Sequence, residues 1–284
     1  MRSGKAPSPA AARTGVLRVS ALALAAALLV APQARAGDGA VAIHHACATA
    51  TGCFAGDAPG YPVTIDGSAG LHYVLTSSLI LPNPDTTGIR VATSDVSIDL
   101  GGFKIIRADC VGATTSCRFP GTGRGIEVAS QLYLGLRVRD GDIVGMGRGG
   151  IFAGGQAKIS NVRVSQAAGN GIQAGGASVV TDCRSFSNLG DGIQVGPASV
   201  VSGNAVVSNG STGISTFNGS LVLENLIRNN SSGLLNNSVG TPFFDTGYRG
   251  NIITNNGNPP QVRQGVDLGA NLCLGPGDTN PICP

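Results

Sequence analysis

Apolar residues return along this chain at a nearly constant interval. From residue 125 onward, a series of Gly-Ile or Gly-Leu pairs recurs at steps of 25, 21, 21, 21 and 20 residues. The six pairs are Gly125-Ile126, Gly150-Ile151, Gly171-Ile172, Gly192-Ile193, Gly213-Ile214 and Gly233-Leu234. Self-similarity at a fixed step of this length is typical of repeat proteins, in which each unit stacks on its neighbours.

Alignment of the units at the 21-residue step shows which positions face inward. Small or apolar residues, together with asparagines, occupy alternate positions, which is the period-two pattern of a half-buried strand. One inner column holds Val162, Cys183, Asn204 and Asn225, and the next holds Val164, Ser185, Val206 and Ile227. The flanking residues are then predicted to point outward, namely Asn161, Arg163, Asp182 and Arg184.

The asparagines predict ladders inside the repeat. A buried amide costs free energy unless it is hydrogen-bonded, so Asn204 and Asn225 are expected to bond each other from coil to coil at a turn. A second column, Asn188, Asn209 and Asn230, is expected at another turn, where these asparagines would adopt left-handed backbone geometry. Cys183 is expected to be a small buried apolar residue, and a reactive thiol is the alternative.

Composition decides which repeat architecture fits. Leucine-rich repeats need leucine at fixed positions, whereas this chain uses Ser, Asn, Val and 44 glycines, the residues of short strands broken by tight turns. Propeller blades are about twice as long as these units and usually contain tryptophan, which is absent here. We therefore predict an all-β, single-domain parallel β-helix with one coil per 21-residue unit and strands stacked at ~4.8 Å.

The two ends of the chain differ from the repeat. Residues 1–36 contain a basic leader, an apolar run at 19–31 and an A-x-A site at 34–36, which predicts a signal peptide cleaved near Ala36 and a secreted or periplasmic protein. A membrane anchor is the alternative, but the apolar run is shorter than the roughly 20 residues of a spanning helix, and no membrane span is expected in the mature chain. Residues 37–95 are then an N-terminal cap with the first coils, 96–272 are the repeats, and 273–284 are a C-terminal tail.

An insertion interrupts the repeat at residues 236–250. It contains three of the twelve aromatic residues, Phe243, Phe244 and Tyr248, beside Arg249. A loop that leaves a regular scaffold is a common place for binding residues, so these four are candidates for ligand binding, together with Asn161 of the outward positions. A hydrophobic flap packed over the coils is the alternative.

Removal of the leader changes the charge of the chain. It takes 5 of the 19 basic residues, so the mature chain has 14 basic against 16 acidic side chains. No basic cluster with interleaved aromatic residues is present, and nucleic-acid binding is therefore not expected.

Six of the seven cysteines form three close pairs in sequence. The pairs Cys47 with Cys53, Cys110 with Cys117, and Cys273 with Cys283 predict local disulfides, as in a protein of an oxidising compartment. Metal ligation is the alternative, but no C-x-x-C spacing occurs and we expect no metal site.

The chain resembles bacterial secreted right-handed parallel β-helix repeat proteins, which have the pectate-lyase-like fold. The resemblance rests on VSIDLGGFKI at 96–105, on the Gly-Ile repeats, and on the closing Gly269-Ala270-Asn271-Leu272-Cys273 with Cys283-Pro284. It implies a right-handed coil over most of the mature chain. It does not specify an activity, because this fold hosts polysaccharide lyases, glycoside hydrolases, esterases, epimerases and non-enzymatic adhesins.

The resemblance directs attention to the outward columns, since enzymes of this fold carry catalytic groups on the outer face of a parallel sheet. One column holds Asp140, Asn161, Asp182, Gly203 and Glu224, and the next holds Asp142, Arg163 and Arg184. Asp140 and Asp182 lie two coils apart, hence ~9.6 Å, near the carboxylate separation of an inverting glycosidase. In a lyase the acids would bind calcium, and Arg163 or Arg184 would abstract a proton.

Neither catalytic pattern is complete, since no histidine follows His72. A solvated charged face, with Asp142 and Arg163 as a cross-strand pair, explains the same residues. We expect an exported protein that engages polysaccharide or another cell-envelope component, or that serves as a surface and interaction scaffold. A lyase or glycoside hydrolase acting on uronate-containing polysaccharide is the alternative, so whether the chain is an enzyme stays open. No cofactor is expected, apart from calcium in the lyase alternative.

Overall fold

The structure is a computed structural model of the 284-residue chain. It describes residues 35–36, 39–68, 70–113, 117–237, 245–258, 260–276 and 283. The chain divides into two units, 1–32 and 33–284, and the first lies outside the described residues. The predicted signal peptide therefore also lies outside them, except for β1 (Arg35–Ala36), which pairs antiparallel with β2 (Ala40–Ile43).

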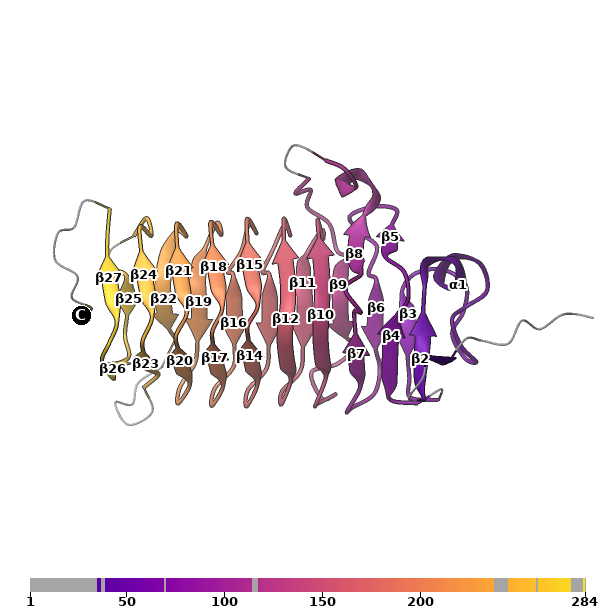
Figure 1. The fold of residues 1–284 in the computed structure, drawn as a ribbon, viewed down its shortest axis with the longest axis horizontal. Coiled ribbons are helices and arrows are strands. Elements are labelled where there is room, and N and C mark those ends of the chain that lie inside the picture. Colours follow the sequence, from indigo (N-terminus) through magenta and orange to yellow (C-terminus); the bar gives the residue numbers. More distant parts are fainter. Residues whose placement is uncertain are drawn as a thin grey trace, which may run out of the picture. The chain divides into compact units, whose positions relative to one another are not determined.

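Residues 33–284 form a stack of coils built from two parallel sheets (Figure 1). Each coil contributes one short strand to the nine-stranded sheet, which we call sheet B. Its strands are β3 (Val63–Ile65), β6 (Ile89–Val91), β9 (Arg124–Val128), β11 (Gly149–Ala153), β13 (Ile172–Ala174), β16 (Ile193–Val195), β19 (Thr212–Thr216), β22 (Ser232–Asn236) and β25 (Val262–Arg263).

The 18-stranded sheet, sheet A, receives two strand segments from most coils. The first segments are β4 (His72–Leu75), β7 (Ser97–Asp99), β14 (Val179–Thr181), β17 (Val200–Ser202), β20 (Leu221–Leu223), β23 (Gly247–Arg249) and β26 (Val266–Asp267). The second segments are β5 (Leu79–Leu81), β8 (Lys104–Arg107), β15 (Arg184–Phe186), β18 (Ala205–Val207), β21 (Leu226–Arg228), β24 (Ile252–Thr254) and β27 (Leu272–Leu274). In β10 (Arg137–Val144) and β12 (Lys158–Ser165) the two segments are continuous.

The predicted inner and outer positions of the repeat are confirmed. The isoleucines of the Gly-Ile pairs are buried on the inner face of sheet B, and both predicted inner columns of sheet A are buried opposite them. Glycine precedes each isoleucine because the coil is narrow there. A Cβ on Gly192 would lie 2.2 Å from Cγ1 of Val206 and 2.7 Å from the carbonyl oxygen of Gly213.

The predicted outward column that contains Asp140 has a backbone geometry that the strand pattern did not anticipate. Asp140, Asn161, Asp182, Gly203 and Glu224 have φ between 51° and 67°, so the left-handed residue makes a bend between the two segments of each coil. Aspartate, asparagine and glycine tolerate this conformation better than other residues do. The side chains of Asn161, Asp182 and Glu224 in this column are exposed, as the outward assignment predicted.

Asparagine ladders line the core of sheet A. The Nδ2 of Asn204 donates to Oδ1 of Asn225 at 2.9 Å, and the ladder continues from Asn225 to Asn251 at 3.0 Å. The second ladder likewise joins Asn188, Asn209, Asn230 and Asn256. The expectation of left-handed geometry at this second column was wrong by one residue. The positive φ belongs to the preceding position, at Ser187, Ser208 and Asn229, and it frees each following asparagine to turn its amide into the core.

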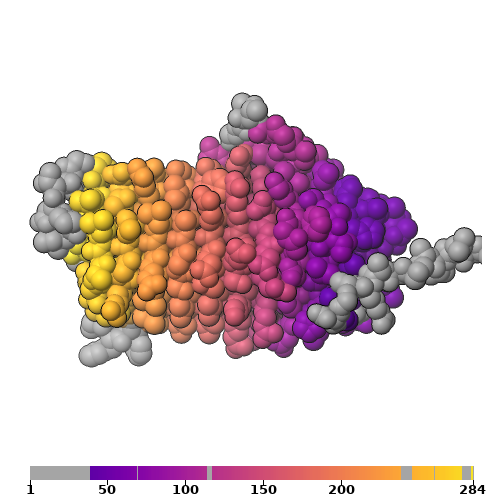
Figure 2. Space-filling view, viewed as in Figure 1, coloured from indigo at the N-terminus to yellow at the C-terminus, as the bar shows by residue number. Residues whose placement is uncertain are grey.

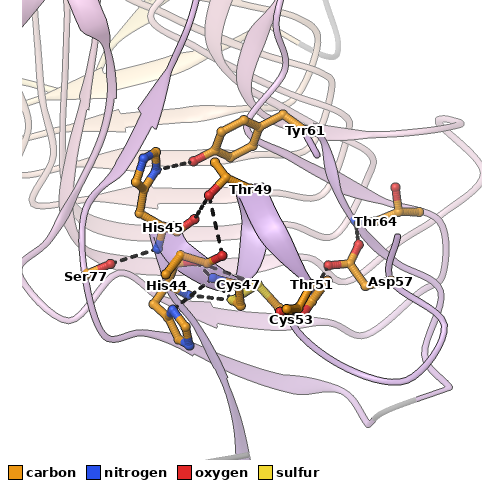
Figure 3. The surroundings of a disulfide bond; sticks show 12 residues. His44, His45, Cys47, Thr49, Thr51, Cys53, Asp57, Tyr61, Thr64 and Ser77 are labelled. Carbon is orange, nitrogen blue, oxygen red and sulfur yellow. Dashed lines mark hydrogen bonds between the residues drawn. A yellow bond between two sulfur atoms is a disulfide. The ribbon is translucent and has the colours of Figure 1, made fainter. Parts of the chain in front are cut away.

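All three predicted disulfides are present, and Cys183 is a free, buried cysteine. The Cys47–Cys53 disulfide holds α1 (His45–Ala50), which lies beside β2 at the N-terminal end of the stack (Figures 1 and 3). At this helix, Nδ1 of His44 accepts a hydrogen bond from the Cys47 amide at 3.1 Å. The Cys110–Cys117 disulfide follows a short 3₁₀-helix, η1 (Ala108–Cys110), in the segment that projects beyond β8 (Figure 1).

Candidate functional site

The outer face of sheet A carries a concavity of about 290 Å³ that runs along the bend between the two strand segments. Its lining comes from four consecutive coils, which appear as successive ridges in the space-filling view (Figure 2). The lining residues are Gly102, Asp140, Gly141, Asp142, Asn161, Val162, Arg163, Asp182 and Arg184. Six of the seven polar residues of the two outward columns therefore meet in one place, and the seventh, Glu224, lies outside it.

The strand register explains why these side chains converge. Asp142 pairs with Arg163 and Arg163 pairs with Arg184 in the parallel ladder, so the three side chains leave the sheet in one column. Successive positions of such a column are ~4.8 Å apart. The bend places Asp140, Asn161 and Asp182 in the adjacent column, on the same side of the sheet.

Each carboxylate of the concavity is engaged by a neighbour. Asp140 accepts hydrogen bonds from Nδ2 of Asn161 at 2.8 Å and from Arg139 at 3.0 Å, and Asp182 accepts one from the Thr181 hydroxyl at 3.0 Å. Asp142 lies 3.7 Å from Nζ of Lys104 in the preceding coil. Asp142 and Arg163 are cross-strand neighbours as expected, but the ion pair that Asp142 forms among the described residues is with Lys104.

The two arginines differ from the acids in their surroundings. The Arg163 guanidinium lies over the ring of Phe186, 4.8 Å from its centroid, a cation–π contact that fixes its position without neutralising its charge. Among the residues that the structure describes, neither Arg163 nor Arg184 takes part in an ion pair. The concavity thus offers two neighbouring guanidinium groups that form no ion pair among the described residues, beside three carboxylates and the Asn161 amide.

The predicted binding residues of the insertion have different outcomes. Phe243 and Phe244 lie outside the described residues. Tyr248 was wrongly assigned to the loop, since it belongs to β23 and is 0 % exposed, packed in the core of the coil. Arg249 is exposed on the outer face of the same strand, several coils from the concavity. Asn161 is the one predicted binding residue that lies in the concavity.

A second polar surface on sheet B escaped the sequence analysis. The residue after each repeat isoleucine points outward there, which aligns Glu127, Phe152, Gln173 and Gln194 in one register. The Arg124 guanidinium lies 4.3 Å from the centroid of the Phe152 ring and 3.2 Å from Oε2 of Glu127. Burial lowers the pKa of Arg124 from its usual value, and the hydrogen bond to Glu127 opposes that shift. The sequence signal for this surface was the residue that follows Gly-Ile in each unit. The sequence analysis searched for acids and arginines on the outward columns and did not consider this position.

Neither a metal cluster nor a spanning helix is found among the described residues. No group of three or more His, Cys, Asp or Glu side chains is arranged to hold a metal ion there. Within the same ranges, no helix has the length and apolar character needed to cross a membrane.

Comparisons with known proteins extend the description of the fold. The family model described as "Right handed beta helix region" matches residues 63–240, which is more than half of the chain. No curated protein matches the sequence. Among solved structures, the A-module of the mannuronan C-5 epimerase AlgE4 from Azotobacter vinelandii is similar at 12 % identity, with a TM-score of 0.41, over 72 % of this chain and 79 % of that one. A likeness of this extent says nothing about the reaction of the present chain.

Proposed function

The chain belongs to the right-handed β-helix family, and from the surface that this fold presents we propose that it engages an acidic polysaccharide through the concavity of sheet A. The family match and the parallel sheets confirm the prediction of a right-handed parallel β-helix. The ligand class is our own inference, and it rests on the side chains that line the concavity.

The observation that carries the proposal is the pair of arginines on neighbouring coils that form no ion pair among the described residues. Arg163 and Arg184 are adjacent in register, ~4.8 Å apart, and both are exposed. Guanidinium groups bind carboxylates through two parallel hydrogen bonds, so a uronate carboxylate is a well-matched ligand. The Asn161 amide lies beside them in the concavity; its Nδ2 donates to Asp140, and its Oδ1 can accept a hydrogen bond from a sugar hydroxyl group.

Carboxylates already bonded to neighbours are less suited to catalysis than to shaping a site. Each of the two carboxylate oxygens of Asp140 already accepts a hydrogen bond from a neighbouring side chain, one from Asn161 and one from Arg139. Binding without turnover is therefore the primary proposal. A lyase or glycoside hydrolase that uses the same aspartates and arginines is the second candidate, and a scaffold without a glycan ligand is the third.

Binding to oligouronates, measured by isothermal titration calorimetry on the purified mature protein, tests the proposal. We expect Arg163→Gln and Arg184→Gln each to weaken binding about 10-fold or more, the loss of one charge-assisted bidentate contact. Arg228→Gln is the matched control, because Arg228 is exposed on the same sheet outside the concavity. Equal effects of all three substitutions would show nonspecific charge attraction and contradict the proposal.

A parallel activity screen separates the three candidates. The protein is incubated with uronate-containing polysaccharides with and without calcium, and ultraviolet-absorbing unsaturated product and new reducing ends are both measured. Unsaturated product identifies a lyase, and reducing ends alone identify a hydrolase. Binding without either product supports the primary proposal, while neither binding nor turnover favours the scaffold.

A further inference from the structure

The outer face of sheet A changes character along the stack of coils. The outward column of the second segments is charged for four coils and apolar for the next four. In register, it reads Lys104, Asp142, Arg163, Arg184, Ala205, Leu226, Ile252 and Leu272. The outward column of the first segments changes in the same direction, from Arg137 and Lys158 to Val179, Val200, Leu221, Gly247 and Val266.

The apolar part of this face is exposed. Six of its large side chains are between 36 % and 49 % accessible, which is unusual for leucine, isoleucine and valine in regular strands. They are Leu221, Leu226, Ile252, Val266, Leu268 and Leu272, and we call this set the apolar strip. The strip exposes on the order of 400 Å² of apolar surface, a size that commonly marks a binding site.

The strip is continuous with the charged concavity. Arg184 is followed in its own column by Ala205 and then by Leu226, so the apolar strip begins two coils, or ~10 Å, beyond the last arginine. Between the two columns the bend carries Gly203, Glu224 and Gly250 in successive coils, and a Cβ on Gly250 would lie 3.3 Å from Cγ of Glu224. One extended ligand lying parallel to the stack would therefore contact guanidinium groups at one end and aliphatic side chains at the other.

We propose that this face binds an amphiphile, with an anionic sugar head at Arg163 and Arg184 and an alkyl chain along Leu226, Ile252 and Leu272. The inference rests on the proposed function of the concavity and narrows its ligand to a lipid-linked acidic sugar. From Ala205 to Leu272 the column spans ~14 Å, about the length of an extended dodecyl chain. The match concerns length and polarity together, since the arginines complement the head and the strip complements the chain.

The dimensions of the strip argue against a second copy of the protein as its occupant. A stable dimer buries roughly 800 Å² on each partner, about twice the apolar area exposed here. The charged half of the face adds little to such a contact, because two copies would place like arginines and lysines in an interface that desolvates them. A single alkyl chain needs only the area that the strip provides.

Alkyl glucuronides of increasing chain length test the inference, titrated by calorimetry below their micelle concentrations. Burial of only one side of the alkyl chain should tighten binding about 2-fold for each methylene, half of the logarithmic gain for full burial, and so about 250-fold over the eight methylenes between butyl and dodecyl glucuronide. The substitutions Leu226→Thr and Ile252→Thr together should reduce the affinity for dodecyl glucuronide about 10-fold and leave butyl glucuronide unchanged. Threonine keeps the strand propensity of these exposed positions, so the variant should fold, and circular dichroism checks this.

Two further measurements distinguish the contribution of the sugar head to affinity from that of the alkyl chain. Arg184→Gln should weaken butyl and dodecyl glucuronide by the same factor, and dodecyl maltoside, which has a neutral head, should bind at least 10-fold more weakly than dodecyl glucuronide. Equal affinity for the two dodecyl ligands would overturn the inference, as would a dimer in light scattering that the threonine variant dissociates. If oligouronates bind but the alkyl chain adds no affinity, the inference fails while the proposed function stands.

Discussion

Replacement of Asn225 by alanine tests whether the side-chain ladder holds the coils together. The Oδ1 of Asn225 accepts hydrogen bonds from the backbone amide and from Nδ2 of Asn204, each at 2.9 Å. Its own Nδ2 donates to the carbonyl oxygens of Val201 and Leu223 at 2.9 Å and to Asn251 at 3.0 Å. One side chain thus satisfies polar groups from three successive coils, and all of these contacts are buried or partly buried.

The expected cost follows from the groups left without partners. Asn225→Ala removes the acceptor of the Asn204 backbone amide, and an unsatisfied buried donor costs about 1–3 kcal/mol. The Nδ2 of Asn204 loses its hydrogen bond to Asn225 but keeps the one to the Val180 carbonyl oxygen at 3.0 Å, so this amide group is still partly satisfied. With the small cavity that the shorter side chain leaves, the free energy of unfolding should fall by about 3 kcal/mol.

Urea denaturation followed by far-ultraviolet circular dichroism measures this loss. Asn258→Ala is the matched control, because Asn258 is exposed and its expected effect is below about 0.5 kcal/mol. The loss in free energy of unfolding of the double variant Asn204→Ala, Asn225→Ala should be about 1 kcal/mol smaller than the sum of the two single losses. The reason is that each substitution removes a hydrogen-bond partner of the other residue. Two results would refute the ladder as a source of stability. One is a loss in free energy of unfolding for Asn225→Ala no larger than that for Asn258→Ala, and the other is strict additivity of the two single losses in the double variant.

Three further predictions concern the repeat, the free thiol and export. Gly192→Ala should destabilise the fold by about 1–3 kcal/mol, because its Cβ would lie 2.2 Å from Val206; a thermal midpoint equal to that of the wild type would contradict this. Burial raises the pKa of Cys183 to about 12, so the thiol stays protonated at pH values well below that, and alkylation at mildly alkaline pH should require denaturant. Rapid labelling of Cys183 in the native protein would contradict the inward assignment of its column. Mass spectrometry of the exported protein should give a chain that starts near Gly37, whereas a soluble protein that retains Met1 would exclude cleavage.

The architecture was predictable because the same pattern of buried and exposed positions recurs in each coil of the repeat. The isoleucines after glycine and the alternation around Val162 and Val164 identified the buried faces of both sheets, and the structure bears them out. The bend at Asp140 was not predictable from alternation, since a left-handed residue keeps its side chain outward while turning the chain. The register at Asp182 was nevertheless correct, so the columns brought the six residues of the concavity together.

Errors arose where the period of the repeat changes. Tyr248 was placed in a loop because the step from Asn225 to Asn251 is 26 residues instead of 21, and the extra residues hid the strand that resumes at Gly247. The polarity change beyond Arg184 was readable from the same 21-residue step, through Ala205 and Leu226. Attention to charged positions alone left that apolar half of the column unexamined, and only the register of the strands shows that it shares a face with the arginines.

The ladders also bear on how such a chain changes length over evolutionary time. Asn204 contacts Asn225 through the same atoms that join Asn188 to Asn209 and Asn209 to Asn230, so the coils that carry these asparagines present the same interface upward and downward. Duplication of one 21-residue segment, such as 193–213, would add a coil whose two ladder asparagines and glycine already fit both neighbours. Each duplication would lengthen the stack by ~4.8 Å without a new core, so the number of coils is a heritable trait that selection can adjust independently of the fold.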